Sequence, residues 1–262
     1  MNDKKDFSAE KVREIINTNF IGREIHFYEK VTSTFDIAKE IEKKDGTVII
    51  AKEQTAGKGR LGRSWESLKG GLYFSVILST KYFMPHLQFA TVLCALAVQK
   101  SIGEITDCYI KWPNDIVSKE GKKLCGILSK TEFSDGKAEF INVGIGINAN
   151  NSCFSKELKF ASSIKNITGE KVNENKLLCR VFENLEALLF EDKKKITGEF
   201  SKVCITVGSR VKAIYPDGRK EIGVCTEVTS DGSIVILKDN SEAVCVNSGE
   251  VSVRGIYGES YV

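Results

Sequence analysis

The residues best suited to chemistry lie in one polar segment that is rich in glycine and in cationic side chains. Residues 54–63 read QTAGKGRLGR, with three glycines and three cations interleaved. Glycine lets a backbone approach a ligand closely or adopt a positive φ, and the cations face whatever the loop encloses. Such a loop suits a ligand with more than one negative group. We interpret it as an anion-binding loop rather than as a mobile, solvated basic segment.

Two literal matches to the dinucleotide-binding fingerprint, G-x-G-x-x-G/A, lack the context that the fingerprint needs. They begin at Gly57 and Gly144, and neither runs into a helix-forming segment. The fingerprint requires a helix that starts inside the motif and places its N-terminus on the pyrophosphate. The chain also lacks the G-x-x-x-x-G-K-[ST] pattern of a Walker A loop. Both of these nucleotide-binding classes are therefore excluded.

A turn with two charged residues, KWPND at residues 111–115, ends a short predicted strand. Pro113 stops the strand and fixes the turn, so Lys111 and Asp115 could both point into one cleft. The alternative is a strand-ending turn with an ordinary surface salt bridge. The motif alone leaves both interpretations open.

Two glycine-containing strands could form the floor of such a cleft. In KLCGIL, residues 123–128, strand alternation puts Lys123 and Gly126 on opposite faces. Gly126 leaves room for a ligand or for another backbone. In VGIGIN, residues 143–148, the glycines allow a flat ring to approach, and Asn148 offers it a hydrogen-bonding edge. The alternative for this segment is a strand with a β-bulge.

The elements that must position these residues mix strands and helices without regular βαβ alternation, which favours an α+β fold. Hydrophobic patterning predicts strands at 47–51, 72–79, 109–112, 115–118, 124–130 and 138–147. It predicts helices at 8–19, from Ser33 to about Gly46, from Pro85 to Gly103, and at 174–190. Ser33 is the expected N-cap of the second helix, with Asp36 completing an acidic variant of the capping box.

The pattern changes after Phe200. Short β-rich runs separated by PDG, SDG and DNS turns extend from Val207 to Val253 and predict a small five- or six-stranded barrel of SH3-like size. We therefore divide the chain into a larger domain, residues 1–204, and a barrel, residues 205–262. The barrel segment holds six Lys or Arg and eight Asp or Glu, so the chain's positive charge lies in the larger domain. That is where an anionic ligand would bind.

Composition also restricts the environment of the protein. The eight cysteines are scattered without a C-x-x-C pair, and only two histidines occur, so we expect reduced thiols and no zinc site. No apolar run reaches the ~18 residues of a membrane helix, and the first residues lack the apolar stretch of a signal peptide. These features predict a cytoplasmic protein with no membrane association.

Taken together and in order, the motifs resemble those of the biotin protein ligases, from about Gly22 to the C-terminus. The segments that carry the resemblance are TST at 32–34, the GKGRLGR loop followed by Trp65, KWPND, KLCGIL and GIGIN. The resemblance implies a mixed-sheet catalytic domain like that of class II synthetases and biotin–lipoate ligases, followed by the SH3-like barrel. It also implies an enzyme that activates biotin with ATP and attaches it to a lysine of a biotin carboxyl carrier protein.

The resemblance implies a role for each site residue. Biotin would be held by Ser33, Thr34, Gln54, Gly57, Lys58, Gly59, Arg60, Lys123 and Gly126. ATP and the adenylate would be bound by Arg60, Arg63, Trp65, Asn148 and Ala149, with the indole stacked near the adenine. The catalytic residues would be Arg60, Arg63, Lys111, Asp115 and Lys123.

The physical logic of the reaction agrees with these roles. A carboxylate must attack the α-phosphorus of ATP, so two anions must meet, and Arg60, Arg63 and Lys123 could neutralise their repulsion. Mg²⁺ would hold the leaving pyrophosphate and would arrive mainly with ATP. A loop that folds over the adenylate would exclude water. A carrier lysine would then displace AMP, and Asp115 could orient that amine or take its proton.

Two residues depart from the usual pattern of the family. A polar residue usually stands at the position of Phe35, which puts contact with biotin there in doubt. Arg usually stands at the position of Lys58, so the charge is kept and the bidentate geometry is lost. Only about 25 residues precede the catalytic segments, too few for the helix-turn-helix of repressor members, so we expect no binding to operator DNA. Homodimers are common among relatives, so a homodimer is possible here, but no segment of the sequence proves a symmetric interface and the oligomeric state is left open.

Three other functions compete with this interpretation. A lipoate or octanoate ligase shares the fold, but its typical Arg-Arg and Gly-Gly-Gly pocket segment is not visible here. A catalytically silent sensor of biotin or its adenylate would not need Lys111, Asp115, Arg60 and Lys123. A nucleic-acid-binding protein that uses the basic loop and the barrel is disfavoured because the barrel segment is acidic.

Overall fold

The computed structural model describes residues 7–248 and 252–255, and its centre is a seven-stranded mixed sheet. The strands lie in the order β1 (Ile25–Val31), β2 (Val48–Gln54), β3 (Leu72–Ser79), β7 (Lys137–Ile147), β6 (Lys123–Ser134), β5 (Asp115–Ser118) and β4 (Cys108–Lys111). β1 is parallel to β2, and the other neighbours are antiparallel. The predicted α+β class with a mixed sheet is confirmed.

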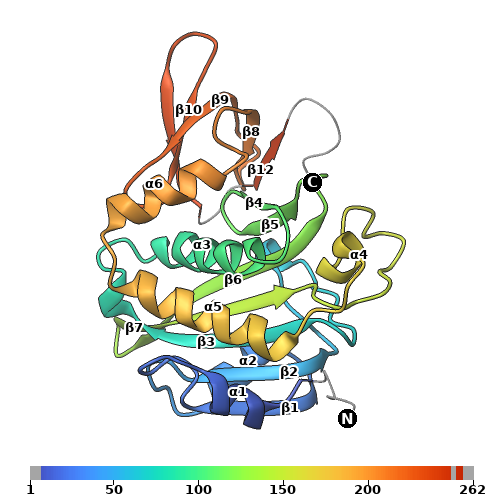
Figure 1. Ribbon diagram of the computed structural model, residues 1–262. Helices are drawn as coiled ribbons and strands as arrows, with labels where there is room; N and C mark the ends of the chain where they lie inside the picture. The colour runs from blue at the N-terminus through green and yellow to red at the C-terminus, as the bar shows by residue number, and fades with distance from the viewer. Residues whose placement is uncertain (1–6, 249–251, 256–262) are drawn as a thin grey trace.

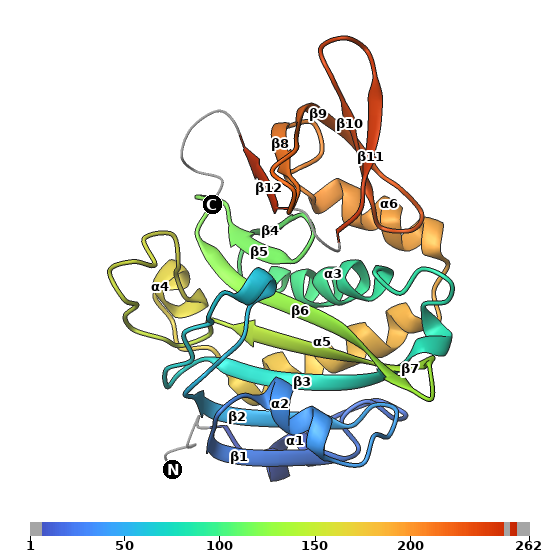
Figure 2. The same cartoon turned by 180° about the vertical axis from the view of Figure 1, so that it is seen from behind.

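Helices cover the two faces of this sheet unequally. One face carries α1 (Ala9–Ile15), α3 (Phe89–Gly103) and α5 (Glu174–Leu189), while α2 (Thr34–Glu40) and the segment after β2 lie on the other face (Figures 1 and 2). α3 is buried almost all round its circumference because it packs against the sheet, α5 and α6 (Lys193–Val203). None of the described helices is long and apolar enough to span a lipid bilayer.

The second sheet is small and antiparallel. Its strands lie in the order β11 (Ala243–Val246), β10 (Ile234–Leu237), β9 (Lys220–Val228), β8 (Arg210–Ile214) and β12 (Ser252–Gly255). Five strands agree with the small SH3-like unit that the turn spacing predicts. The boundary at residue 204 stays a prediction, and α6 ends at Val203 immediately before it.

Several element boundaries differ from the predicted ones. α3 begins at Phe89 rather than at Pro85, because the amides of Phe89, Ala90 and Thr91 bond three residues back and form tight turns before the α-helical pattern begins. β1 has no predicted counterpart, since IHFYEKV is a half-exposed edge strand without clean alternation. α6 was also missed, because three lysines and Gly198 obscure its apolar face. The short helix α4 (Ile164–Thr168) was missed as well.

The cysteines are all free thiols, and most of them lie in the core as expected. Six are buried, whereas Cys153 and Cys245 are exposed. Burial raises the pKa of the Cys94 thiol to about 12, so that thiol stays protonated and unreactive near neutral pH.

Trp112 ties the two sheets together. It is 2% exposed, its backbone amide donates to Oγ1 of Thr206 at 3.0 Å, and its indole nitrogen donates to the carbonyl of Gly232 at 3.0 Å. Beside it, the amide of Ile205 donates to the carbonyl of Ile110 at 3.0 Å. The end of β4 is therefore fixed against the second sheet through both its backbone and its largest side chain.

A carboxylate at the opposite end of the core fixes the chain before β1. Glu186 of α5 is 6% exposed and accepts hydrogen bonds from the amides of Asn19, Phe20 and Ile21 and from the side chain of Asn19. Burial by itself raises the pKa of Glu186, but these hydrogen bonds together lower it below its usual value. The charged form of Glu186 is therefore stabilised by folding.

We predict that Glu186→Gln lowers the free energy of unfolding by about 1–3 kcal/mol, because one amide N–H₂ then faces donors that need an acceptor. Glu186 has a lowered pKa in the folded state, so its contribution is present above about pH 4.3, the ordinary value for Glu, and is lost as the pH falls through the lowered pKa. Urea unfolding at neutral and acidic pH measures the difference. Glu183→Gln on the same helix is the control; equal losses in the two variants would contradict the prediction.

Candidate active site

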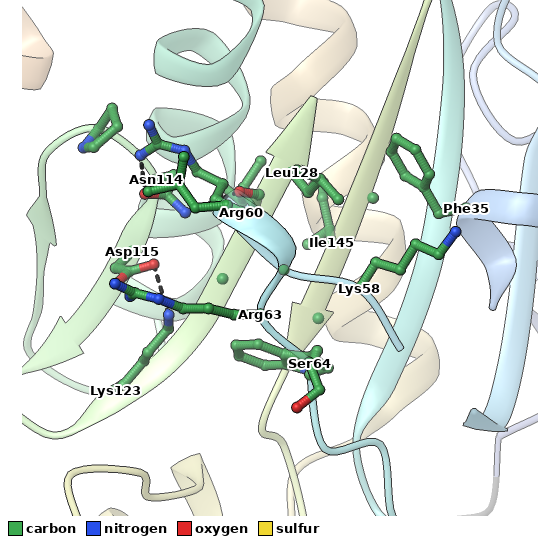
Figure 3. Close-up of a pocket in the computed structure, with 18 of the residues that line it drawn as sticks. Phe35, Lys58, Arg60, Arg63, Ser64, Asn114, Asp115, Lys123, Leu128 and Ile145 are labelled. Atoms are coloured by element: carbon green, nitrogen blue, oxygen red, sulfur yellow. Dashed lines mark hydrogen bonds and ion pairs between the residues drawn. The ribbon is translucent and has the colours of Figure 1, made fainter. Parts of the chain in front are cut away.

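A cavity of about 460 Å³ lies against the face of the seven-stranded sheet that carries α2 (Figure 3). It brings together residues from α2, the loop after β2, the β4–β5 turn, β6 and β7. The predicted site residues that line it are Ser33, Thr34, Gln54, Lys58, Gly59, Arg60, Arg63, Trp65, Lys111, Asp115, Lys123 and Gly126. Segments far apart in the sequence thus converge on one space, as their order predicted.

Charged residues gather at one end of the cavity. Lys111 and Asp115 are paired across the β4–β5 hairpin, and Oδ1 of Asp115 lies 2.8 Å from Nζ of Lys123. Arg63 extends toward this ion pair from the loop (Figure 3). Lys111 is buried at 8% exposure. The KWPND turn is therefore part of the cavity wall rather than an isolated surface turn.

A β-bulge places Lys123 on the same wall as Gly126, which corrects the prediction from strand alternation. Val117 pairs with Lys123 while Ile116 pairs with Cys125, so β6 has one extra residue at this point. The extra residue reverses the alternation, and both Lys123 and Gly126 line the cavity. Strict period-2 alternation was wrong here because the pattern cannot reveal a bulge.

Arg60 connects the loop to two other parts of the molecule. Its guanidinium donates to Oδ1 of Asn114 at 3.0 Å and to the carbonyl of Ser248, which follows β11. Burial lowers the pKa of Arg60, and the nearby Asp115 opposes that effect. Sequence reasoning missed Asn114, whose own amide group donates to the carbonyl of Ile127 at 3.0 Å. Its position after the proline of KWPND is the signal that could have identified it.

Neutral polar groups gather around Gln54. Oε1 of Gln54 accepts from the backbone amide of Thr34 at 2.8 Å and from its hydroxyl at 3.2 Å. Nε2 of Gln54 donates to Ser67 at 2.8 Å, and Ser75 donates to the hydroxyl of Thr34 at 3.0 Å. These bonds fix the orientation of the amide. Ser67 and Ser75 were missed, although Ser75 is the one polar residue in the apolar core of β3.

Phe35 and Lys58 close the end of the cavity away from the charged cluster (Figure 3). A Cβ at Gly144 would lie 3.0 Å from the Phe35 ring, so the ring packs directly on β7. Nζ of Lys58 lies 2.6 Å from Oδ1 of Asp36, and this hydrogen bond lowers the pKa of Asp36. Ser33 caps α2 as predicted, but Asp36 pairs with Lys58 and Lys39 instead of completing a capping box.

Trp65 lies flat over two glycines of the sheet. A Cβ at Gly126 would come within 2.6 Å of the indole, and a Cβ at Gly146 would collide with its nitrogen. Nζ of Lys123 lies 5.2 Å from the ring centroid, within the range of a cation–π contact. The two glycines therefore make room for the indole of Trp65, and all three residues line the cavity.

Three predicted residues do not line the cavity in the described part of the chain: Gly57, Asn148 and Ala149. The carbonyl of Gly57 accepts from the amide of Trp65 at 2.8 Å. Asn148 is buried and its side chain donates to the carbonyl of Lys123 at 3.2 Å, so it supports the backbone behind that lysine. Their contacts with a ligand stay predictions.

The glycine-rich loop is folded by its own hydrogen bonds. Gly59 donates to the carbonyl of Arg63 at 2.8 Å, and Arg63 donates back to Arg60 at 3.2 Å. Isolated bridges join Lys58 to Ser64 and Gln54 to Ser67. Leu61, at the tip, has a φ of 54° and is 56% exposed. The loop is therefore ordered, and its residues 58–61 and 63 line one side of the cavity. We call this covering loop the roof of the cavity.

The cavity has few groups that could bind a metal ion. Asp115 is the one carboxylate among its described lining residues, and Lys123 already pairs with it. Within residues 7–248 and 252–255, no cluster of three or more His, Cys, Asp or Glu side chains could hold an ion. A cavity with several cations and one carboxylate suits a polyanionic ligand that brings its own cation.

Comparisons with known proteins agree with this geometry. Residues 27–148 match the model of the biotin/lipoate A/B protein ligase family. The bifunctional ligase/repressor BirA of Bacillus subtilis is 34% identical over 94% of this chain and 79% of its own length. The biotin–[acetyl-CoA-carboxylase] ligase of Mycobacterium tuberculosis is 26% identical over 79% of each chain. A structure of the biotin protein ligase from Aquifex aeolicus in complex with biotin and ATP has a TM-score of 0.79 at 32% identity, covering 89% of this chain and 99% of that one.

The mixed sheet, the cationic glycine-rich loop at the cavity and the small second sheet, together with these relatives, define a protein-modifying ligase. The chain belongs to the biotin/lipoate A/B protein ligase family. Its function within that family is that of a biotin protein ligase.

We predict that Gly146→Ala displaces the indole of Trp65, since the new methyl group would occupy the position of the indole nitrogen. Trp65 and Trp112 are the two tryptophans of the chain, and Trp112 stays buried between the sheets. Tryptophan emission should therefore shift to the red and become easier to quench with acrylamide. Gly198→Ala, where a Cβ meets nothing within 4 Å, is the control. An unchanged spectrum in Gly146→Ala would refute the packing argument.

Proposed function

We propose that residues around this cavity catalyse two consecutive steps, the formation of biotinyl-5'-AMP from biotin and ATP and the transfer of biotin to a carrier lysine. The observation that carries the proposal is the division of one cavity into two ends. Arg60, Arg63 and Lys123 gather beside Asp115 at one end, and Phe35 lies at the other (Figure 3). Gln54 accepts a hydrogen bond from Thr34, the residue next to Phe35, so its network belongs to that second end. A ligand with a neutral polar head and an anionic tail fits this polarity.

Biotin would lie with its ureido ring at the neutral end and its carboxylate toward Lys123. Thr34 and Gln54 offer hydrogen-bonding groups whose positions are fixed by Ser75 and Ser67, and Ser33 offers a hydroxyl that caps α2. Phe35 supplies an apolar wall where relatives usually have a polar residue. Gly57, Lys58 and Gly59 would hold the loop closed above the ring, with Lys58 tied to α2 by Asp36.

In the first step a carboxylate oxygen of biotin attacks the α-phosphorus of ATP, and the bond to pyrophosphate breaks. Three cations at the charged end neutralise the two approaching anions and the charge that develops on the phosphoryl oxygens. Lys111 is close enough to Asp115 to add a fourth. ATP enters as its Mg²⁺ complex, because the cavity itself offers one carboxylate. Trp65 would present the free face of its indole to the adenine, with Asn148 and Ala149 supporting that side.

In the second step the amine of a carrier lysine attacks the acyl carbon and AMP leaves. Asp115 is the one carboxylate at the cavity wall, so it orients the amine and accepts its proton once Lys123 turns to the adenylate. The carrier is the biotin carboxyl carrier protein of a biotin-dependent carboxylase. We place the reaction in the cytoplasm, where ATP is available and free thiols persist.

The test is release of AMP and pyrophosphate with MgATP and a biotin carboxyl carrier domain, with mass spectrometry of the carrier. Lys123→Ala should lower kcat/KM by about 10²–10³, the usual cost of removing one group that stabilises transition-state charge. Lys122→Ala is the matched control, because its Nζ bonds to the carbonyl of Lys159 outside the cavity.

Each alternative gives a different result in this experiment. A mass gain with lipoate in place of biotin would move the chain to the lipoate ligases. Tight biotin binding without pyrophosphate release would identify a sensor. Wild-type activity in Lys123→Ala would overturn the role of that residue while leaving the ligase function intact.

We predict that Phe35→Ala raises KM for biotin about ten- to hundredfold, because it removes an apolar wall that is 5% exposed and packs on Gly144. The KM for ATP should change little, since Phe35 lies at the end away from the charged cluster. Steady-state kinetics with each substrate varied in turn measures the split. Phe133→Ala, at an exposed position outside the cavity, should match the wild type; equal changes in both KM values would disprove the assignment.

A further inference from the structure

A second cavity, of about 270 Å³, lies next to the catalytic one and has no role in the mechanism above. It is bounded by the N-terminal end of α3, by β6 and β7, and by Ser248, which follows β11. The two cavities share four lining residues: Arg60, Leu61, Pro113 and Leu128. The tip of the glycine-rich loop and the KWPND turn thus form a partition between them.

The partition contains a strained residue. Leu61 has a φ of 54°, a left-handed conformation that is unfavourable for a bulky side chain. It is held there by the hydrogen bonds that link Gly59, Arg60 and Arg63, while its side chain is 56% exposed. A shift of Leu61 would relieve this strain and join the two cavities.

The second cavity differs from the first in its chemistry. Among its described lining residues there is no Asp, Glu, Lys or His. Its one cation, Arg60, bonds to Asn114 and to the carbonyl of Ser248. The other polar groups are neutral, and two of them, Thr91 and Ser129, bond to each other at 2.6 Å. The remaining wall is apolar.

An amine acts as a nucleophile only in its uncharged form, and the neutral surroundings of the second cavity favour that form. The catalytic cavity is lined by five cations, Lys58, Arg60, Arg63, Lys111 and Lys123. They repel an incoming ammonium group, and the adenylate already fills the space between them. A neutral, partly apolar passage favours the uncharged form of a lysine side chain, because burial disfavours its charged form. It also suits an unbranched butyl chain.

We propose that the second cavity is the passage through which the acceptor lysine of the carrier reaches the acyl carbon, with Leu61 as the gate. This inference rests on the proposed two-step function. The lysine gives one proton to solvent as it enters. Its nitrogen then bonds to the acyl carbon, the bond from that carbon to the phosphate oxygen breaks, and AMP leaves with the electron pair. Of the two protons left on the nitrogen, one passes to Asp115 and the other stays as the amide N–H.

The test separates the two half-reactions in variants that fill the passage. Thr131→Trp and Gln88→Trp place an indole in the second cavity from β6 and from the end of α3. Ser134→Trp adds the same group on the same strand, at an exposed position outside both cavities. Each protein is loaded with biotin and MgATP. Three rates are then measured: first-turnover pyrophosphate release, discharge of the adenylate by hydroxylamine, and transfer to the carrier domain.

If the second cavity is this passage, Thr131→Trp and Gln88→Trp should release pyrophosphate at the wild-type rate. Their bound adenylate should also react with hydroxylamine at the wild-type rate. Their transfer to the carrier should slow at least about tenfold, since a displaced nucleophile loses its reactive geometry, while Ser134→Trp transfers normally. Wild-type transfer in both filling variants would overturn the proposal, as would an equal slowing with hydroxylamine and carrier. If the wild type itself makes no adenylate, the proposed function fails instead, and this is visible before any variant is compared.

Discussion

Five cationic side chains share the catalytic cavity, and they repel one another in a space where water screens charge poorly. The fold keeps them together by giving them internal partners. Lys58 pairs with Asp36, Lys123 pairs with Asp115, and Arg60 bonds to Asn114 and to the carbonyl of Ser248. These partners come from three parts of the chain: α2, the KWPND turn and the segment after β11. The loop, α2, the KWPND turn and the second sheet are therefore linked to one another through the charges that the chemistry requires.

These internal partners also explain how the site responds to substrate. Two of the partners, Asn114 and the carbonyl of Ser248, are neutral acceptors and are weaker than an incoming phosphate or carboxylate. In the proposed mechanism Lys123 would serve the adenylate and Asp115 would serve the amine, so their ion pair must separate before either step. Binding of the first substrate would then release the group that the second step needs.

The KWPND turn joins the architecture to the chemistry. Trp112 is anchored to Thr206 and Gly232, while its neighbour Lys111 and the end of the turn at Asp115 line the cavity. A side chain that holds two sheets together thus stands directly beside two site residues. A shift of the second sheet would therefore move this part of the cavity wall through the KWPND turn.

The motifs predicted which segments meet, and the structure adds how they meet. Hydrophobic periodicity was sufficient for the α+β class and for the six core strands from β2 to β7. The motifs and the resemblance to the biotin protein ligases supplied twelve residues of the cavity wall. The bulge in β6 could not be predicted, because one extra residue reverses the faces without changing the pattern. Ser67, Ser75 and Asn114 were also missed. Their importance comes from neighbours distant in the sequence, such as Gln54 and Arg60, rather than from their own motifs.

The roof formed by the glycine-rich loop has a consequence for the energetics of recognition. Its hydrogen bonds, from Gly59 to Arg63 and from Lys58 to Asp36, join groups of the chain to one another. The ordering entropy of these residues is therefore spent during folding, so a larger share of the contact energy with a ligand becomes affinity. A ligand held beneath the roof would have to wait for the loop to open before it could leave. Affinity and the rate of exchange would then depend on the same few hydrogen bonds.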